Sequence, residues 1–177
     1  MTFEDAFAVI EVPNAAYLVG DLFEESFGAA FPTPRVNCGL PIHTPPEYWH
    51  QFVAFYRWPD GRFETVGFCN WIRFGPVYLK GGLCVRPGFY RRLPIDHFQE
   101  CSGSGGIAQL MMEAGARKLN DCEAWFGYCG DRKAFLVGSR VGYRRLESPY
   151  LIAKWFKNVP ETRQKELETL VAKIGAF

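Results

Sequence analysis

Residues 50–85 contain the feature that most constrains the fold, three runs rich in β-branched and aromatic residues that follow one another closely. Pro59-Asp60-Gly61 separates the first run from the second, and Gly75-Pro76 separates the second from the third. Connections this short join antiparallel neighbours, because parallel strands need a crossover of a dozen residues or more. The chain is therefore expected to contain an antiparallel β-meander.

The middle run of this meander also predicts how its two faces differ. Alternate side chains of a strand point to opposite faces of the sheet. One alternating set is strongly apolar and the other is mixed; the apolar set is Val66, Phe68, Ile72 and Phe74. We therefore expect one strongly apolar face and one mixed face.

Helices and further strands flank the meander in the sequence. Apolar residues recur at helical spacing from Gly106 to Leu119, which predicts a helix with one packing face. The other predicted elements are a strand at 7–12, a helix after Pro13-Asn14, a strand at 123–130, a helix capped by Asp131, a hairpin over 141–157 and a helix over 160–174. Residues 31–46 and 86–104 lack a regular apolar period and are predicted as irregular connections. This order predicts an α/β (α+β) fold.

Length and charge restrict the class of protein. The 177 residues suit one domain, residues 1–177, and the net charge of +1 argues against a nucleic-acid partner. No long apolar run is present, so we expect no membrane span and a cytoplasmic location. The six cysteines, at 38, 69, 84, 101, 122 and 129, form no C-x-x-C pair. Buried reduced thiols and no metal site are therefore expected.

A glycine-rich segment, residues 101–106, stands directly before the helix that starts near Gly106. Three sites can be written with its letters: a dinucleotide fingerprint, the nucleophile loop of a cysteine phosphatase, or a cradle of helix amides for a pyrophosphate. The fingerprint needs a strand directly before its first glycine, but the last predicted strand residue is Val85. A phosphatase needs an arginine near the end of the loop, where this chain has Ile107.

Residues on both sides of this segment carry a family resemblance. Leu83-x-Val85-x-Pro87, then Gly106-Ile107-Ala108, and further on Asp131-x-x-Ala134 with Gly142-Tyr143 resemble the motifs of the Gcn5-related N-acetyltransferase superfamily. The resemblance spans about residues 51–156. It implies that family's fold, a mixed and largely antiparallel sheet with flanking helices in a single domain.

The resemblance also implies a cosubstrate, acetyl-coenzyme A, and a place for it. In the family the strand with the L-x-V-x-P motif separates from its neighbour and binds the pantetheine arm, and the loop before the helix binds the pyrophosphate. The residues implied to bind the coenzyme are Leu83, Cys84, Val85, Gly103, Ser104, Gly105, Gly106, Ile107, Ala108 and Asp131. Small residues suit such a loop because backbone amides approach a phosphate only where no side chain intervenes.

Two departures from the family pattern affect the chemistry. About thirteen extra residues separate Pro87 from the loop, and Arg91 or Arg92 in them would supply a charge that Gly103 lacks. Gly138 stands where many members have the tyrosine that protonates the departing thiolate. Tyr128, Tyr143 and Ser139 are the candidates to replace that tyrosine, although Tyr143 aligns with a core aromatic of the family. The candidates for the base are His97 and Glu100, because they lie in the insertion.

We therefore predict an acyl-coenzyme A-dependent N-acyltransferase that moves an acetyl group to an amine of a small molecule or protein, as a monomer or homodimer. Tyr48 and Trp49 are the aromatic residues expected in the acceptor pocket. One alternative is a protein of the same fold that binds coenzyme A without efficient catalysis, which Gly103 and Gly138 favour. Another is an NAD(P)-binding oxidoreductase that uses Gly103 to Ala108.

Overall fold

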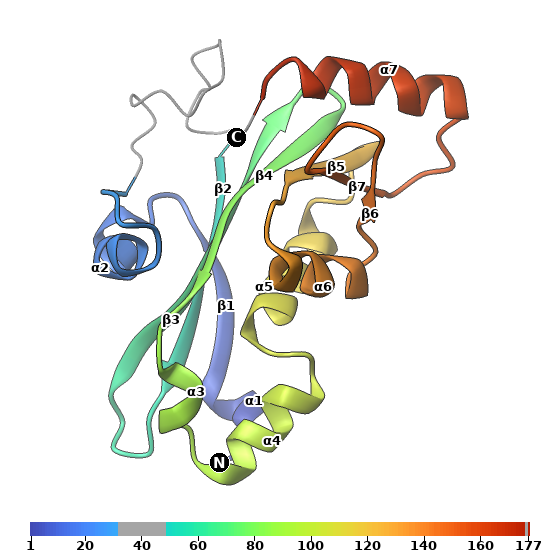
Figure 1. Ribbon diagram of the computed structural model, residues 1–177. Coiled ribbons are helices and arrows are strands. Elements are labelled where there is room, and N and C mark those ends of the chain that lie inside the picture. The colour runs from blue at the N-terminus through green and yellow to red at the C-terminus, as the bar shows by residue number, and fades with distance from the viewer. Residues whose placement is uncertain (32–48, 176) are drawn as a thin grey trace.

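The computed structural model describes residues 1–31, 49–175 and 177 of the chain, and its centre is a single mixed sheet (Figure 1). In this part of the chain the sheet has seven strands in the order β1-β2-β3-β4-β5-β7-β6. The strands are β1 (Phe7–Val12), β2 (Trp49–Arg57), β3 (Phe63–Phe74), β4 (Val77–Val85), β5 (Ala124–Tyr128), β6 (Arg144–Arg145) and β7 (Leu151–Trp155). All neighbours are antiparallel except β4 and β5, which are parallel.

The predicted meander is confirmed, and two register shifts interrupt it. Opposite Ala54 and Phe55 of β2, the strand β3 has one extra residue, because Ala54 pairs with Gly67 and Phe55 with Thr65. Between β3 and β4 the shift is reversed, and Gly81 and Gly82 both lie opposite Asn70. Such bulges bend a strand and change which face its side chains join.

Helices cover both faces of the sheet. They are α1 (Phe3–Ala6), α2 (Ala16–Phe27), α3 (Phe89–Arg92), α4 (Ile95–Gly103), α5 (Ile107–Lys118), α6 (Arg132–Arg140) and α7 (Glu161–Ala172). The side chains of α5 and α6 pack with one face of the strands, whereas those of α2 and α7 pack with the other. Figure 1 shows α5 and α6 beside each other, with α2 and α7 apart from them. The predicted helices after Pro13, near Gly106, after Asp131 and after Pro160 are thus confirmed.

The mixed face of the meander is buried as thoroughly as the apolar face. Trp71 and Cys69 of β3 are fully buried under α5, and Val66 joins them in the same cluster. Val66 was expected on the face of Phe68, but the bulge in β3 beside it changes the alternation. Phe68 instead packs with the α2 side. The assignment of Val66 was therefore wrong, and both faces form core.

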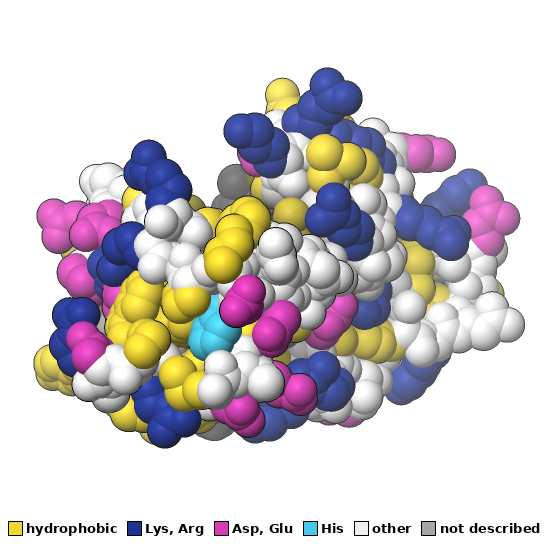
Figure 2. Space-filling view, turned by 90° about the horizontal axis from the view of Figure 1, so that it is seen from below, with side chains coloured by type: hydrophobic (Ala, Val, Ile, Leu, Met, Phe, Trp, Pro, Cys, Tyr) yellow, Lys and Arg dark blue, Asp and Glu magenta, His cyan; other side chains and the backbone are white. Residues whose placement is uncertain are grey.

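The segment between β4 and α5 was predicted as irregular, and that prediction is wrong. It contains α3 and α4, which lie with α1 at the lower end of the molecule in Figure 1. The N-terminus ties α4 down: the Phe3 amide donates to Glu100 (2.9 Å) and the carbonyl of Met1 bonds His97 (2.9 Å). Figure 2 views this end from below and shows hydrophobic side chains gathered between charged ones.

Two further findings concern the whole described chain. The five described cysteines are free thiols, and four of them are buried, as expected. Cys38 and Tyr48 lie outside the described residues. Trp49 is buried among β3, β5 and α7 residues, so its predicted place in an acceptor pocket is wrong. Among the helices of the described ranges, none combines the length and the apolar character that crossing a bilayer requires.

The contact between α5 and β3 generates the first prediction. A Cβ added at Gly115 would lie 2.7 Å from the fully buried ring of Trp71, which has no room to move. Gly115→Ala should therefore lower the free energy of unfolding by about 1–3 kcal/mol despite its gain in helix propensity. Urea denaturation measures the difference.

Gly20 of α2 gives a matched control, since no described atom lies within 4 Å of its added Cβ. Gly20→Ala should raise stability by about 0.5–1 kcal/mol through helix propensity alone. Equal effects of the two substitutions would contradict the close packing of α5 on Trp71.

Candidate functional site

The strands β4 and β5 pair only along the first half of β4. Their register runs from Val77 opposite Ala124 to Lys80 opposite Gly127 and then stops. Beyond this point β4 continues to pair with β3 up to Val85, whereas β5 continues to pair with β7. We call this divergence the fork; its closed end is the Lys80–Gly127 pair, and its β4 side is the open edge Gly81–Val85.

The backbone of the open edge presents, at two positions, groups that have no hydrogen-bond partner among the described residues. The Arg86 amide donates to the Val66 carbonyl at 2.8 Å, so Arg86 faces β3. Backbone groups alternate along an antiparallel pair, which turns the N–H and C=O of Val85 and Leu83 away from β3 and into the fork. Cys84 has the opposite orientation, and its side chain packs toward α2. Leu83 and Val85 are therefore the residues of the predicted L-x-V pattern that face the fork.

The glycine-rich segment lies at the start of α5, beside the far end of the open edge. Gly67 pairs with Val85, and a Cβ on Gly67 would lie 3.1 Å from Ile107, the first residue of α5. Gly105 and Gly106 have φ of 83° and 87°, in the region that favours glycine. Gly103 and Ser104 are instead the last residue and the C-cap of α4. The loop proper is thus Gly105-Gly106, followed by the first amides of α5.

The hydroxyl of Tyr90 lies at the same helix start. It accepts a hydrogen bond from the Ile107 amide at 3.0 Å, and a Cβ added at Gly106 would lie 3.0 Å from it. Burial raises the pKa of Tyr90, so the hydroxyl is neutral at physiological pH. No sequence pattern indicated this contact, because Tyr90 lies in α3, in the segment predicted as irregular.

The arginines of the insertion have different environments. The Arg92 guanidinium binds the Glu64 carboxylate at 2.7 Å and stacks on Trp58 at 5.2 Å. Burial acts to raise the pKa of Glu64, but hydrogen bonds from Arg92 and Trp58 outweigh it and leave that pKa below its usual value. Arg92 is therefore engaged in holding α3 to β3. Arg91 is exposed, and the structure records no ion pair for it among the described residues.

His97 and Glu100, the base candidates from the insertion, lie in α4 and contact the N-terminal segment and β2. The His97 imidazole bonds the Tyr56 hydroxyl (2.6 Å) through one nitrogen and the Met1 carbonyl through the other. Glu100 accepts from the Phe3 amide. His97 is 6% exposed, so its imidazole is buried at this end of the molecule. These contacts join α4 to α1 and the sheet rather than to the fork.

Two other predicted residues have clear local surroundings. The Asp131 carboxylate accepts from the Ala134 amide at 2.7 Å, which makes it the predicted N-cap of α6. Burial raises the pKa of the Cys101 thiol to about 11, so Cys101 is no nucleophile at neutral pH. Both findings agree with ordinary structural roles for these side chains.

Tyr128 ends β5 next to the fork and is 42% exposed. It alternates with Gly127 and shares a face with Phe126, which packs on the α7 side. Its ring lies 5.8 Å from that of Tyr150, the one described non-glycine residue with positive φ (64°). The two exposed tyrosines thus stand on the face of the fork opposite α5.

Gly138 of α6 faces the core behind the fork. An added Cβ would meet Ile152 and Tyr143 at 3.7 Å, an ordinary contact. The buried Tyr143 hydroxyl and the Trp71 indole N–H have no hydrogen-bond partner in the described residues. Burial raises the pKa of Tyr143 well above its usual value, so its hydroxyl does not ionise.

Lys80 is the residue that sequence reasoning missed. It stands at the closed end of the fork and is half-buried, with its Nζ donating to the Gly81 carbonyl at 3.4 Å. Removal from water lowers its pKa. A single charged residue in the apolar run "VYLKGGLCV" was the available signal.

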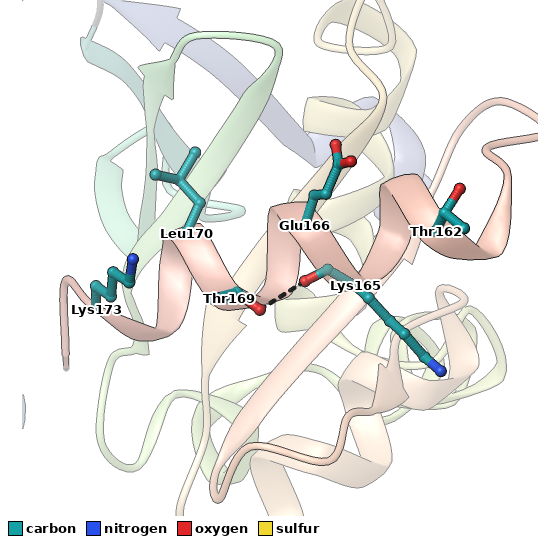
Figure 3. A pocket seen from close by; sticks show the side chains of 6 residues that line it. All are labelled: Thr162, Lys165, Glu166, Thr169, Leu170 and Lys173. Atoms are coloured by element: carbon teal, nitrogen blue, oxygen red, sulfur yellow. Dashed lines mark hydrogen bonds between the residues drawn. The ribbon is translucent and has the colours of Figure 1, made fainter.

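A shallow depression also runs along α7, and it has none of these features. Figure 3 shows the lining side chains spreading from the surface of the helix, and its only drawn bond joins Thr169 to the Lys165 carbonyl. The lining side chains are Thr162, Lys165, Glu166, Thr169, Leu170 and Lys173. We therefore place the candidate site at the fork.

Comparison of the sequence with protein-family models and with curated protein sequences finds no match. Solved structures do match. The ribosomal-protein-S18-alanine N-acetyltransferase from Escherichia coli aligns with a TM-score of 0.54 at 10% identity, over 88% of this chain and 97% of that chain. Nourseothricin acetyltransferase aligns with a TM-score of 0.53 at 13% identity, over 86% and 99%.

An aminoglycoside 6'-N-acetyltransferase in complex with coenzyme A also aligns, with a TM-score of 0.53 at 10% identity, over 87% of this chain and 99% of that chain. Likeness at such identities establishes the fold and nothing beyond it. The chain has the Gcn5-related N-acetyltransferase fold, as the sequence motifs predicted.

The Glu64 contacts generate a pH prediction. Because the folded-state pKa of Glu64 is lowered, its stabilising effect is present above the unfolded pKa and is lost as pH falls through the folded one. At pH 7, Glu64→Gln should cost about 1–2 kcal/mol, the value of charge-assisted hydrogen bonds. Urea denaturation from pH 7 to pH 3 should show the two proteins converging in stability.

Glu166→Gln is the control, since Glu166 is 66% exposed in its pair with Arg163. Exposed pairs contribute little, so its stability should follow the wild type at every pH. A Glu64→Gln difference that stays constant down to pH 3 would show that the carboxylate charge plays no part.

Proposed function

We propose that the protein is an acyl-coenzyme A-dependent N-acyltransferase that transfers an acetyl group from acetyl-coenzyme A to an amine of a small molecule or protein. The observation that carries this proposal is the fork. It joins an open strand edge, with Leu83 and Val85 turned outward, to the glycine loop at the start of α5. A long ligand with an amide-containing arm and a phosphate end fits both.

The residues present suit such a ligand. A flexible arm that carries amides completes the hydrogen bonds of Leu83 and Val85, as an added strand would. At the other end, the amides of Gly105 and Gly106 donate to the carbonyls of Ser102 and Cys101, and the Ile107 amide donates to Tyr90. The amides proposed to meet the phosphate are therefore those that follow in the first turn of α5, from Ala108, at the positive end of the helix. The Tyr90 hydroxyl holds the end of the loop by accepting a hydrogen bond from the Ile107 amide. When bound, the thioester supplies an activated acyl carbon that an amine can attack.

The acceptor amine is proposed to approach from the opposite face, where Tyr128 and Tyr150 are exposed. Their positions at the end of β5 and before β7 border the fork. The positive φ of Tyr150 costs conformational energy that the surrounding structure must offset, a frequent property of binding sites. Tyr128 thus remains a candidate for contact with the reacting groups, whereas we no longer propose His97 or Glu100.

An NAD(P)-binding oxidoreductase is less consistent with this geometry. Its fingerprint requires a strand that leads through the glycines into the helix. Here α4 stands in that place, and Ser104 caps it. The alternative of a coenzyme-binding protein without catalysis rests on Gly103 and Gly138 and is decided by experiment.

Two measurements test the proposal. Acetyl-coenzyme A at a hundredfold its Kd should raise the free energy of unfolding by about 2.7 kcal/mol, seen as a thermal shift. Release of free thiol across a panel of small amines and peptides should then reveal turnover. No shift at millimolar acetyl-coenzyme A would refute coenzyme binding, and a shift without thiol release from any amine would favour the binder. A shift with NADPH alone would favour the oxidoreductase.

The glycine loop generates a paired prediction. Gly106→Ala places a methyl group at φ 87° and 3.0 Å from the Tyr90 hydroxyl, directly before the α5 amides proposed to bind phosphate. We expect its affinity for coenzyme A to fall at least about tenfold, since bonds to charged groups contribute 1.5–3 kcal/mol each. Isothermal titration calorimetry measures the affinity for coenzyme A of Gly106→Ala and of a control variant.

Gly103→Ala is the matched control, because no described atom lies within 4 Å of its added Cβ and it belongs to α4. Its affinity should equal that of the wild type. A loss of affinity in Gly103→Ala with none in Gly106→Ala would place the phosphate contacts at the end of α4 instead.

A further inference from the structure

The position of Lys80 supports an inference that rests on the proposed acyl transfer and adds a residue to it. Lys80 is the last β4 residue that pairs with β5, opposite Gly127. Directly after it, Gly81 and Gly82 form the bulge opposite Asn70. On the other side Lys80 pairs with Trp71, whose side chain lies under α5. The lysine side chain therefore starts at the closed end of the fork, on the α5 face.

The Lys80 ammonium turns toward the open edge. Its hydrogen bond goes to the carbonyl of Gly81, the first residue past the last strand pair. The opposite residue, Gly127, has no side chain that could fill the same space. The ammonium thus lies where the two strands begin to diverge.

The groups that face Lys80 do not neutralise it. They are the thiols of Cys69 on β3 and Cys129 just beyond β5. Burial raises the pKa of Cys69 far above neutrality, so that thiol carries no charge. No carboxylate of the described residues forms an ion pair with Lys80, and the nearby hydrogen-bond partner is a backbone carbonyl. A half-buried cation without a counter-charge is costly, so an anion that forms beside it is stabilised more strongly than it would be in water.

Transfer from a thioester to an amine produces such an anion. The amine nitrogen forms a bond to the acyl carbon, the carbon–sulfur bond breaks, and its electron pair leaves on sulfur. A thiol has a pKa of about 8.5, so the departing sulfur is protonated most readily by a neighbouring acid of similar pKa. Gly138 has no side chain, and the Tyr143 hydroxyl is fully buried among core residues.

We propose that Lys80 is the catalytic acid that donates a proton from Nζ to the departing thiolate at the closed end of the fork. The acceptor nitrogen loses its proton to water on the opposite face as it becomes an amide, and the neutral Lys80 amine regains a proton from water. The lysine ends in its starting form, and the products are one amide and one thiol. Because the ammonium is the active form, activity requires a pH below the pKa of Lys80.

Two variants of Lys80 and one control variant, each followed by two readouts, test this assignment. Lys80→Met removes charge and proton with similar length, whereas Lys80→Arg keeps the charge but holds its proton at neutral pH. The first readout, independent of turnover, is the thiol pKa of bound coenzyme A, followed by thiolate absorbance in the ultraviolet. It should be lowered in the wild type and in Lys80→Arg but not in Lys80→Met.

The second readout is the rate of acetyl transfer against pH. Both Lys80 variants should lose about a hundredfold or more in kcat, the typical contribution of a positioned acid, with the Kd for coenzyme A nearly unchanged. The wild-type rate should fall on the alkaline side as Lys80 loses its proton, and both variants should lack that limb. Lys154→Met is the control, because Lys154 is another partly buried lysine of lowered pKa but stacks on Trp125 and Phe156 of the core.

The outcomes separate this assignment from the proposed function. If the wild type binds coenzyme A and transfers acetyl while Lys80→Met keeps its rate and thiol pKa, the role of Lys80 is refuted and the function stands. Mass spectrometry that finds acetyl on Lys80 as a competent intermediate would also overturn it, since the lysine would then be a nucleophile. A wild-type protein that fails to bind coenzyme A would refute both the proposed function and the role of Lys80.

Discussion

The hydrogen bonding between β4 and β5 ends after four residue pairs, and the candidate site depends on that ending. β4 remains held by β3 as far as Val85, so it cannot follow β5. The Gly81-Gly82 bulge bends it at the point of separation, and the Asn70 side chain packs where a Cβ on Gly81 would stand, at 2.6 Å. Backbone groups of a strand require partners. A ligand with amide groups would therefore supply the hydrogen-bond partners that the backbone lacks at the fork.

The position of α5 converts this open edge into a site with two ends. Ile107 and Met111 pack against Gly67, the partner of Val85, which fixes the helix start beside the end of the open edge. The Tyr90 hydroxyl then accepts from the Ile107 amide and so fixes the first turn of the helix after Gly106. The insertion contributes indirectly: Arg92 binds Glu64 of β3, and this contact holds α3, which bears Tyr90. A segment that departs from the family pattern thus supports the loop.

Short-range patterns predicted the elements, and long-range contacts explain the errors. The meander and α5 follow from turn residues and periodicity that lie within one segment. The helices α3 and α4 were missed because the residues that bury α4, among them Phe3 and Tyr56, are 41 to 97 positions away in sequence. Val66 was assigned to the wrong face because a bulge depends on the partner strand. Trp49 is core for the same kind of reason, since α7 covers it.

Lys80 shows most clearly what sequence alone leaves out. Its neighbours in sequence are an apolar strand and two glycines, which indicate neither a site nor a charge partner. The role proposed for Lys80 depends on its position opposite Gly127, across the only parallel pair of the described sheet. There the open edge of β4, an uncompensated ammonium and the exposed Tyr128 on the other face meet at one point. A thioester ligand would supply hydrogen-bond partners to the open edge and, on reaction, a negative sulfur beside the ammonium. It would thus satisfy the unpaired backbone groups and the unpaired charge together. For this reason the coenzyme side and the acid are assigned to the same face.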